Sequence, residues 1–445
     1  MERAHRNQNN LLKQLPAATR ALLRAVTHRA EQLGAPIYLV GGSVRDLLLN
    51  RPNLDLDLVL EGDAIKLGRA LSHQFGGRLV AHKAFGTSVW WLPGDQKKIF
   101  RALHVPLKGT HRVRLPVFLD LITARRETYR RPAALPTVQF DGIRADQFRR
   151  DFTINTLAIR LDGPDASELL DPWGGFQDLQ NKLLRTLHPL SFSDDPTRIL
   201  RILRQAGRLG FKIETETLRQ LKMYLPILSQ VSGERIRTEL ELALVESERI
   251  SILRSMQKLG VLKTIHPKLP ISPASVRTLK SREPKSVPSL WNLGDYSVSD
   301  LGFILWLMNY PSSSIAGIAD RLSFRAELRD AILFAERLRS LKARLHSMPP
   351  SQVVPILEKM PLLAVYAFFL ANQKTKVGNI LKTYAVKLRH IQPHTDGNDL
   401  RKLGLKPGSH YKHILNRLRA AWLDGEVRTG QQEQKLLKKL IDEYR

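Results

Sequence analysis

The spacing of apolar and polar residues separates a mixed first part of the chain from a helical remainder. Residues 18–34 carry apolar side chains at helical spacing, and residues 37–40 form a short apolar run before a glycine pair. Residues 54–60, LDLDLVL, alternate strictly, which is typical of a strand with one buried face. From about residue 165 onward, apolar residues recur at helical spacing. The pattern therefore predicts helices and strands first, and helices afterwards.

Two aspartates on the alternating strand suggest a metal site. Residues two apart on a strand point to the same side, so Asp55 and Asp57 are expected to converge opposite the leucines. Close carboxylates repel each other, and a Mg²⁺ ion, which prefers oxygen ligands, would offset that repulsion. Asp120, in a later strand predicted over residues 117–127, is a candidate third ligand. A strand that simply faces solvent is the alternative for an isolated pair of this kind.

A glycine turn stands next to these acids. Gly41 and Gly42 fall between the first strand and a helix predicted over residues 43–50, where backbone N–H groups can bind a phosphate. The chain contains neither G-x-x-x-x-G-K-[ST] nor G-x-G-x-x-G, so neither a P-loop nor a dinucleotide fingerprint is indicated. A phosphate-binding turn beside paired acids favours metal-assisted phosphoryl transfer.

Composition indicates a polyanionic partner. The chain of 445 residues has 70 Lys and Arg against 42 Asp and Glu, a formal net charge of +28. Such an excess attracts nucleic acid through phosphate neutralisation and counterion release, with a membrane surface as the rival partner. Because there is no cysteine, disulfides, thiolate zinc sites and Cys nucleophiles are excluded. The N-terminal segment has no apolar signal core and no run approaches the roughly 20 residues that cross a bilayer, so a cytoplasmic location is expected.

Five motifs follow one another in a recognisable order. They are GGSVRDLLLNRPNLDLDLV (41–59), RRDFTINTLA (149–158), LLDPWGG (169–175), DDPTRILRILRQAGRLGF (194–211) and GERIRTEL (233–240). Together they resemble the class II tRNA nucleotidyltransferase and bacterial poly(A) polymerase family, a branch of the polymerase β superfamily. Residues 396–430 are also similar to the C-terminal region of that family.

The resemblance implies roles for the residues of these motifs. Asp55, Asp57 and Asp120 would be the catalytic carboxylates and would bind two Mg²⁺ ions. The residues expected to contact nucleotide phosphate or ribose are Gly41, Gly42, Ser43, Arg45, Arg150, Asp151, Asn155 and Arg201.

The fourth motif is expected to select the base, because the family uses protein side chains in place of a nucleic-acid template. The residues assigned to this role are Asp194, Asp195 and Arg198. Asp195 and Arg198 are three apart, so on one helix they would share a face and could both reach the Watson–Crick edge of one base. A structural ion pair at a helix start is the alternative for this spacing.

One departure from the family pattern bears on the order of addition. Ala133 stands where the family often has glycine, in residues 126–138, which resemble a flexible loop thought to help switch base specificity from C to A. A stiffer hinge there would put the complete C-then-A programme in doubt.

Basic residues outside the motifs are candidates for tRNA contacts. Those singled out are Lys97, Lys98, Arg101, Lys406 and Lys412. The first three belong to the basic segment 94–114, for which an acceptor-stem contact and a solvated hairpin are equally compatible with the sequence.

The expected fold is α+β, with a polymerase-β-like nucleotidyltransferase head of mixed sheet and helices, followed by an elongated all-α neck, body and tail. The predicted segments are an N-terminal helical extension (1–30), the catalytic head (31–165), a neck for base selection (166–245), a helical body (246–330) and a tRNA-binding body and tail (331–445).

The expected activity is addition of nucleotides to the tRNA 3′ end, building or repairing CCA from CTP and ATP by two-metal nucleotidyl transfer. The alternatives are an enzyme that adds only CC or only A, a poly(A) polymerase, and a non-catalytic RNA-binding protein on the same fold. The expected partners are the tRNA 3′ acceptor end, CTP and ATP, with no membrane partner. A complementary nucleotidyltransferase in the same cell is a further possible partner.

Overall fold

The computed structural model describes residues 11–51, 55–103, 115–134, 136–281 and 289–443. The chain divides into two compact units, Met1–Val231 and Ser232–Arg445. Their boundary falls inside the segment that the sequence predicted as a neck. Each unit is described below by itself.

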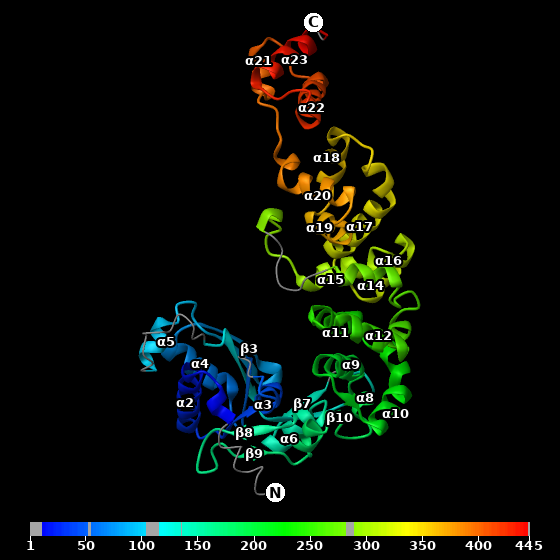
Figure 1. Cartoon of the computed structure of the whole chain (residues 1–445). Coiled ribbons are helices and arrows are strands. Elements are labelled where there is room, and N and C mark those ends of the chain that lie inside the picture. The colour runs from blue at the N-terminus through cyan, green and yellow to red at the C-terminus, as the bar shows by residue number, and fades with distance from the viewer. Residues whose placement is uncertain (1–10, 52–54, 104–114, 135, 282–288, 444–445) are drawn as a thin grey trace. The chain divides into compact units, whose positions relative to one another are not determined.

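A mixed seven-stranded sheet forms the centre of the first unit (Figure 1), with strand order β3-β4-β5-β2-β1-β8-β9. The strands are β1 (Ile37–Val40), β2 (Leu56–Leu60), β3 (Arg78–His82), β4 (Thr87–Trp91), β5 (Phe118–Thr123), β8 (Ala158–Arg160) and β9 (Leu169–Leu170). β2 and β5 run parallel to each other, whereas every other neighbouring pair in this sheet is antiparallel. The predicted mixed sheet is therefore confirmed.

Alternation along β2 and β5 gives this part of the sheet two different faces. Leu56 and Leu58 are buried, as are Leu119 and Leu121, while the aspartates between them are only partly buried. Since successive side chains point to opposite faces, the leucines fill the core and the aspartates lie together on the other side.

Helices and a hairpin complete the first unit. The helices are α2 (Ala17–Gln32), α3 (Gly42–Leu48), α4 (Ala64–Phe75), α5 (Lys97–Ala102), α6 (Ile143–Phe148), α7 (Gly175–Gln180), α8 (Ser191–Asp194), α9 (Arg198–Leu209) and α10 (Thr215–Tyr224). The hairpin pairs β6 (Arg125–Thr128) with β7 (Thr137–Phe140), and a short parallel pair joins β10 (Leu183–Leu184) to β11 (Lys212–Ile213). α4 packs on β3, β4 and β5, and begins where the Asp63 carboxylate accepts hydrogen bonds from the N–H groups of Ile65 and Lys66.

The second unit is helical throughout its described residues (Figure 1). Its α-helices are α11 (Gly233–Val245), α12 (Arg249–Lys258), α13 (Val261–Ile265), α14 (Pro273–Lys280), α15 (Val298–Leu307), α16 (Ser312–Arg321), α17 (Ala326–Leu345), α18 (Pro350–Glu358), α19 (Leu362–Asn372), α20 (Lys376–Val386), α21 (Gly397–Lys402), α22 (Ser409–Asp424) and α23 (Gly430–Asp442). The predicted helical remainder is confirmed for this unit. The expectation of an all-α neck over residues 166–245 is wrong in part, because the short strands β9, β10 and β11 lie within that range. Within the described ranges, no helix combines the length and apolar character needed to cross a membrane.

Candidate active site

A polar cavity of about 370 Å³ in the first unit brings together residues from the first, second and fourth sequence motifs with residues of β5, β6 and the segment that follows β6. Its lining residues are Gly42, Arg45, Asp57, Ile122, Glu127, Tyr129, Arg149, Arg150, Asp151, Asn155, Asp195, Arg198, Arg201 and Gln205. Residues predicted to bind phosphate and residues predicted to read the base thus line the same cavity.

Asp57 and Asp120 are the two acids that strand pairing brings side by side. They are direct partners in the parallel register of β2 and β5, so their side chains leave the sheet on the same face. Burial raises the pKa of Asp57 to about 6. Arg150 and Arg45 act against this rise, and the negative charges of Asp120 and Asp55 add to it. Burial, together with the charge of Asp55, likewise raises the pKa of Asp120.

The prediction that Asp55 and Asp57 share one strand is wrong, because β2 begins at Leu56. Asp55 is an exposed residue just before the strand, and its backbone carbonyl accepts a 2.6 Å hydrogen bond from the Ser43 hydroxyl. Its charge nevertheless acts on both other carboxyls. Leu54, which the prediction placed at the start of the strand, lies outside the described residues.

The paired acids fit a divalent cation. Burial raises the pKa of both carboxyls, and negative charge adds to the rise, from Asp120 and Asp55 at Asp57 and from Asp55 at Asp120. A bound cation would offset both effects. No group of three or more His, Asp or Glu side chains in the described part of the chain is arranged to hold a metal ion. The geometry is therefore that of an acid pair with a third acid nearby.

Asp57→Asn should stabilise the metal-free protein above pH 6, because it removes a buried charge that folding disfavours. The carboxyl has a pKa of about 6 when folded against 3.8 ordinarily, so the cost is absent below pH 3.8 and complete above about pH 6. The expected gain, by urea unfolding at pH 8, is up to about 3 kcal/mol. Mg²⁺ should reduce the difference in unfolding free energy between Asp57→Asn and the wild type, because it stabilises only the wild type. An equal difference in unfolding free energy at pH 4 and at pH 8 would contradict the raised pKa of Asp57.

The glycine turn is shaped by a close approach between backbone and guanidinium. Gly41 has φ of +68°, and a Cβ there would lie 2.6 Å from Nη1 of Arg150. The Gly41 N–H donates to the carbonyl of Leu157, so it serves the fold. The Ser43 hydroxyl also accepts a 3.3 Å hydrogen bond from the Asp57 N–H, which fixes the start of β2. Gly42 lines the cavity.

A hydrogen-bond network joins the first, second and fourth motifs. Arg45 donates to the amide oxygen of Asn155 (2.8 Å), and the amide nitrogen of Asn155 donates to Asp151 (2.8 Å) and Gln205 (3.3 Å). Arg201 forms a 2.9 Å ion pair with Asp151. Although burial alone would raise the pKa of Asp151, Arg201 and the Asn155 amide hold it below its usual value. The network fixes the cationic side of the cavity in one arrangement.

The base-selection pair is arranged differently from the prediction. Asp195 has an extended backbone (φ −133°, ψ 95°) and α9 begins only at Arg198, so the two are not on one helix. Pro196 follows Asp195 and disfavours helical backbone there. The Asp195 carboxylate instead accepts hydrogen bonds from the N–H and hydroxyl of Thr197. Both side chains still line the cavity.

Arg198 is held by two partners on either side of its guanidinium. Nη1 donates to the Ser191 hydroxyl (2.7 Å) and Nη2 to the Arg149 carbonyl (2.7 Å). Asp194, also predicted to select the base, is not among the cavity-lining residues; it lies 3.8 Å from His188. The structure thus brings only two of the three predicted base-selecting residues to the cavity.

Sequence reasoning missed four polar residues of the cavity, which are Glu127, Tyr129, Arg149 and Gln205. Glu127 accepts hydrogen bonds from Arg125, Arg149 and the Tyr129 hydroxyl. Burial, followed by the charge of Glu127, raises the pKa of Tyr129, which therefore stays protonated. Alternation along β6 places residues 125 and 127 on one side of the strand, and Tyr129, which follows the strand, bonds to Glu127 on that side.

Ala133, between β6 and β7, has φ of +60°, in the left-handed region that favours glycine. Its N–H donates a 3.3 Å hydrogen bond to the carbonyl of Ser193 in α8. The segment that resembles a flexible loop is thus held against the residues that precede Asp195, in a backbone conformation that costs alanine about 1–2 kcal/mol. Leu135 of this segment lies outside the described residues.

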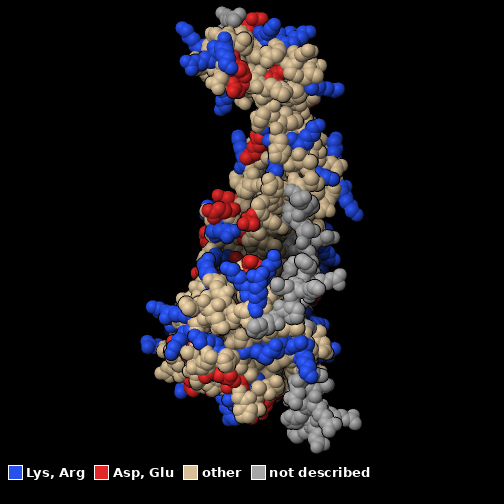
Figure 2. Space-filling view, turned by 90° about the vertical axis from the view of Figure 1, so that its left-hand side faces the viewer, with Lys and Arg blue, Asp and Glu red and all other residues tan. Residues whose placement is uncertain are grey.

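The predicted tRNA-contacting residues are exposed. Lys97, Lys98 and Arg101 lie on α5. In the second unit, Lys406 lies just before α22 and Lys412 lies on it. Figure 2 shows many Lys and Arg side chains on one face and fewer Asp and Glu. Residues 104–114 of the basic segment lie outside the described residues, so the hairpin alternative is not tested.

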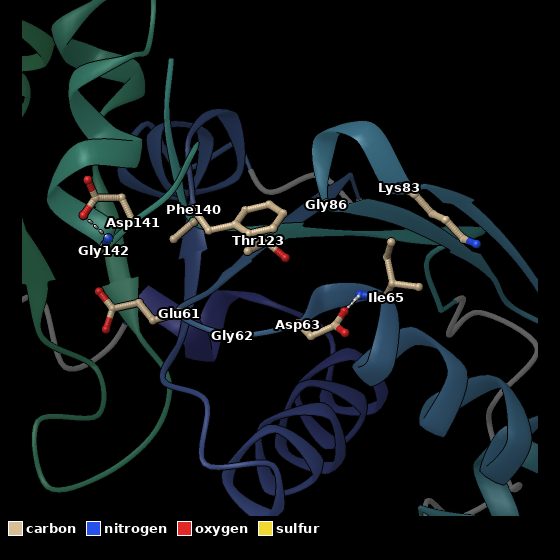
Figure 3. A pocket seen from close by; sticks show the side chains of 11 residues that line it. Glu61, Gly62, Asp63, Ile65, Lys83, Gly86, Thr123, Phe140, Asp141 and Gly142 are labelled. Carbon is tan, nitrogen blue, oxygen red and sulfur yellow. Dashed lines mark hydrogen bonds between the residues drawn. The ribbon is translucent and has the colours of Figure 1, made fainter. Parts of the chain in front are cut away.

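A larger cavity of about 620 Å³ lies at the base of the β6–β7 hairpin (Figure 3), and neither Asp57 nor Asp120 lines it. Its carboxylates serve the fold, since Glu61 accepts from the Ile143 N–H, Asp63 caps α4 and Asp141 accepts from the Gly142 N–H. The Phe140 ring reaches toward Gly86 and Thr123. We therefore place the chemistry in the smaller polar cavity.

Comparison with known proteins identifies the family. Residues 37–185 match the poly(A) polymerase head domain, and residues 210–271 match the probable RNA and SrmB-binding site of polymerase A. An A-adding tRNA nucleotidyltransferase of Halalkalibacterium halodurans is 30% identical over 92% of this chain and 90% of its own length. The chain belongs to the tRNA nucleotidyltransferase family.

Other tRNA nucleotidyltransferases differ in how much they share with the chain. The A-adding enzyme of Geobacter sulfurreducens is 33% identical over 97% of the chain, which spans only 48% of that relative. The CC-adding enzyme of Deinococcus radiodurans is 35% identical over 58% of the chain and 62% of its own length.

Solved tRNA nucleotidyltransferase structures share the fold along the whole chain. The Thermotoga maritima CCA-adding enzyme complexed with tRNA is 29% identical, covers 98% of both chains and gives a TM-score of 0.70. A complex of a CCA-adding enzyme with ATP is 29% identical with the same coverage and a TM-score of 0.75. The predicted α+β head with helical remainder is confirmed by this likeness.

Proposed function

We propose that this protein adds the terminal adenosine to tRNAs that already end in CC. The observation that carries the proposal is that A-adding relatives align with nearly the whole chain, whereas the CC-adding relative from Deinococcus aligns with little more than half. The held, left-handed Ala133 supports it, because an enzyme that adds one kind of nucleotide needs no switch of base specificity.

The cavity supports nucleotidyl transfer to an RNA end. The 3′-hydroxyl loses its proton to solvent as its oxygen forms a bond to the α-phosphorus of ATP. The bond from that phosphorus to the bridging oxygen breaks, and pyrophosphate leaves. Asp57 and Asp120, with Asp55 adjacent, would hold the two expected Mg²⁺ ions. Bound Mg²⁺ lowers the pKa of the attacking hydroxyl and neutralises charge on the triphosphate.

The cationic and base-reading sides of the cavity support ATP binding. Arg45, Arg150 and Arg201 supply positive charge for the triphosphate on the side fixed by the Asn155 network. Asp195 can accept from the exocyclic amine of adenine and Arg198 can donate to a ring nitrogen. We propose that tRNA is held through its shape and phosphates, by basic residues such as those of α5.

Complete CCA addition is a second candidate, because the solved structures that match the whole chain are CCA-adding enzymes. Under the first proposal, a complementary CC-adding enzyme works in the same cytoplasm. Under the second, this chain needs no such partner.

Three tRNA transcripts separate the two candidates. They end before CCA, after C and after CC, and each is incubated with Mg²⁺ and with ATP, CTP or both. The proposal predicts one adenosine on the transcript ending in CC and no cytidine on any transcript. Cytidine on the shortest transcript would favour the second candidate, and no extension of any transcript would refute both.

A further inference from the structure

Three aromatic rings from separate segments meet beside the nucleotide cavity. Phe148 ends α6, Trp173 belongs to the third motif and His188 precedes α8. The Phe148 ring centroid lies 5.0 Å from that of Trp173 and 5.2 Å from that of His188. None of the three lines the cavity, so nucleotide binding there does not account for them.

One ring of this aromatic cluster, that of Phe148, is exposed to solvent, whereas Trp173 and His188 are partly buried. Phe148 is 43% exposed, and Leu190, two residues after His188, is 56% exposed. Large apolar side chains gathered at the surface mark a binding site more often than isolated ones do. The cluster is therefore suited to bind a partner with a flat apolar face.

The rings are held in place before any partner arrives. The Asp171 carboxylate accepts hydrogen bonds from the N–H groups of Gly175 (2.7 Å) and Phe176 (2.9 Å), which closes the turn that carries Trp173. A Cβ on Gly175 would lie 2.2 Å from the Thr153 carbonyl oxygen, so the glycine lets the turn pack closely. A pre-ordered surface loses little conformational entropy on binding.

At two points along the chain, a residue that belongs to the aromatic cluster or pairs with it is followed directly by a residue that lines the cavity. Phe148 is followed by Arg149, and Asp194, which pairs with His188, is followed by Asp195. Both Arg149 and Asp195 line the cavity. Because an RNA 3′-hydroxyl must reach a nucleotide bound there, the unpaired 3′ strand has to cross the surface next to the cavity.

Exposed cations near the cluster match an RNA strand. Arg144 lies four residues before Phe148 on α6, and hence on the same side of that helix. Arg130 and Arg131 are exposed in the segment that Ala133 ties to α8. Unpaired RNA bases are commonly bound by stacking on aromatic side chains with Arg or Lys at the phosphates.

We propose that Phe148, flanked by Trp173 and His188, is a stacking surface for an unpaired base of the RNA 3′ strand. The proposal rests on the proposed function for the direction in which the strand runs. The RNA base, and not the incoming nucleotide, is the occupant, because the rings lie outside the nucleotide cavity.

The test uses a tRNA acceptor-stem minihelix that ends in CC, with 2-aminopurine as the unpaired base before the two cytidines. Stacking quenches 2-aminopurine fluorescence, so wild-type binding should quench it. Phe148→Ala should abolish the quenching and raise the Kd for the minihelix roughly tenfold, with the KM for ATP unchanged. Phe148→Trp should retain the quenching and the wild-type Kd for the minihelix. Phe148→Leu should behave like the alanine variant, because leucine is apolar but cannot stack.

Phe140→Ala is the matched control, since it removes another exposed phenylalanine, at the other cavity, and should change neither quenching nor Kd. A Kd within twofold of wild type for Phe148→Ala would overturn the proposal, as would wild-type quenching by Phe148→Leu. A raised KM for ATP with unchanged Kd would also overturn it, because the ring would then meet the nucleotide. If Phe148→Ala fails to fold, the contrast in quenching and Kd between Phe148→Leu and Phe148→Trp tests the proposal. Wild-type quenching without nucleotide addition would refute the proposed function and leave the stacking surface intact.

Discussion

The double variant Asp57→Ala, Asp120→Ala should lose nucleotide addition by a factor on the order of 10³ or more. These acids are register partners on β2 and β5, and the pKa of Asp57 is raised by burial and further by the charges of Asp120 and Asp55, which a cation would offset. Single-turnover incorporation of labelled ATP into tRNA ending in CC measures the rate. Affinity for the tRNA should stay within twofold, because neither residue supplies positive charge for phosphates.

Asp141→Asn is the control for this variant. Asp141 is an acid of the same unit that pairs with Arg126 at the larger cavity, so its loss should leave the rate of addition near that of the wild type. Addition by the double variant within tenfold of the wild-type rate would show that the metal assignment is wrong.

Asp195→Asn should lower kcat/KM for ATP by about 10- to 100-fold and raise the relative use of GTP and UTP. The carboxylate can only accept hydrogen bonds, which suits the exocyclic amine of adenine, whereas an amide can also donate to the keto oxygens of guanine and uracil. Competition among the four labelled triphosphates on tRNA ending in CC measures the change.

Asp194→Asn is the adjacent control, because that side chain lies by His188 and does not line the cavity. It should change the four-nucleotide preference much less than Asp195→Asn. Equal effects of the two variants would mean that the whole segment matters and that Asp195 does not read the base.

Local patterns in the sequence were enough to predict the strand that carries Asp57 and the face on which that aspartate lies. Strict alternation placed residues 54–60 on a strand with aspartate opposite leucine, and the structure has a strand at Leu56–Leu60 but not at Asp55. The start of a strand depends on where pairing partners end, which alternation does not reveal. Asp55 was therefore assigned to the strand although it lies before it.

Longer-range features were beyond the sequence pattern. The pairing of Asp57 with Asp120 depends on the register of two strands about 60 residues apart, which no local period determines. Glu127 and Tyr129 enter the cavity because the β6–β7 hairpin folds over it. In the fourth motif the helical period was extended across Pro196, although proline disfavours helical backbone in the residue before it.

A structure with Mg²⁺ and a non-hydrolysable ATP analogue tests the central claim, that the polar cavity is the site of nucleotidyl transfer. We expect the α-phosphate and metal at Asp57 and Asp120, and the adenine edge at Asp195 and Arg198. A nucleotide bound in the cavity at the base of the β6–β7 hairpin, with the paired acids free of metal, would contradict it.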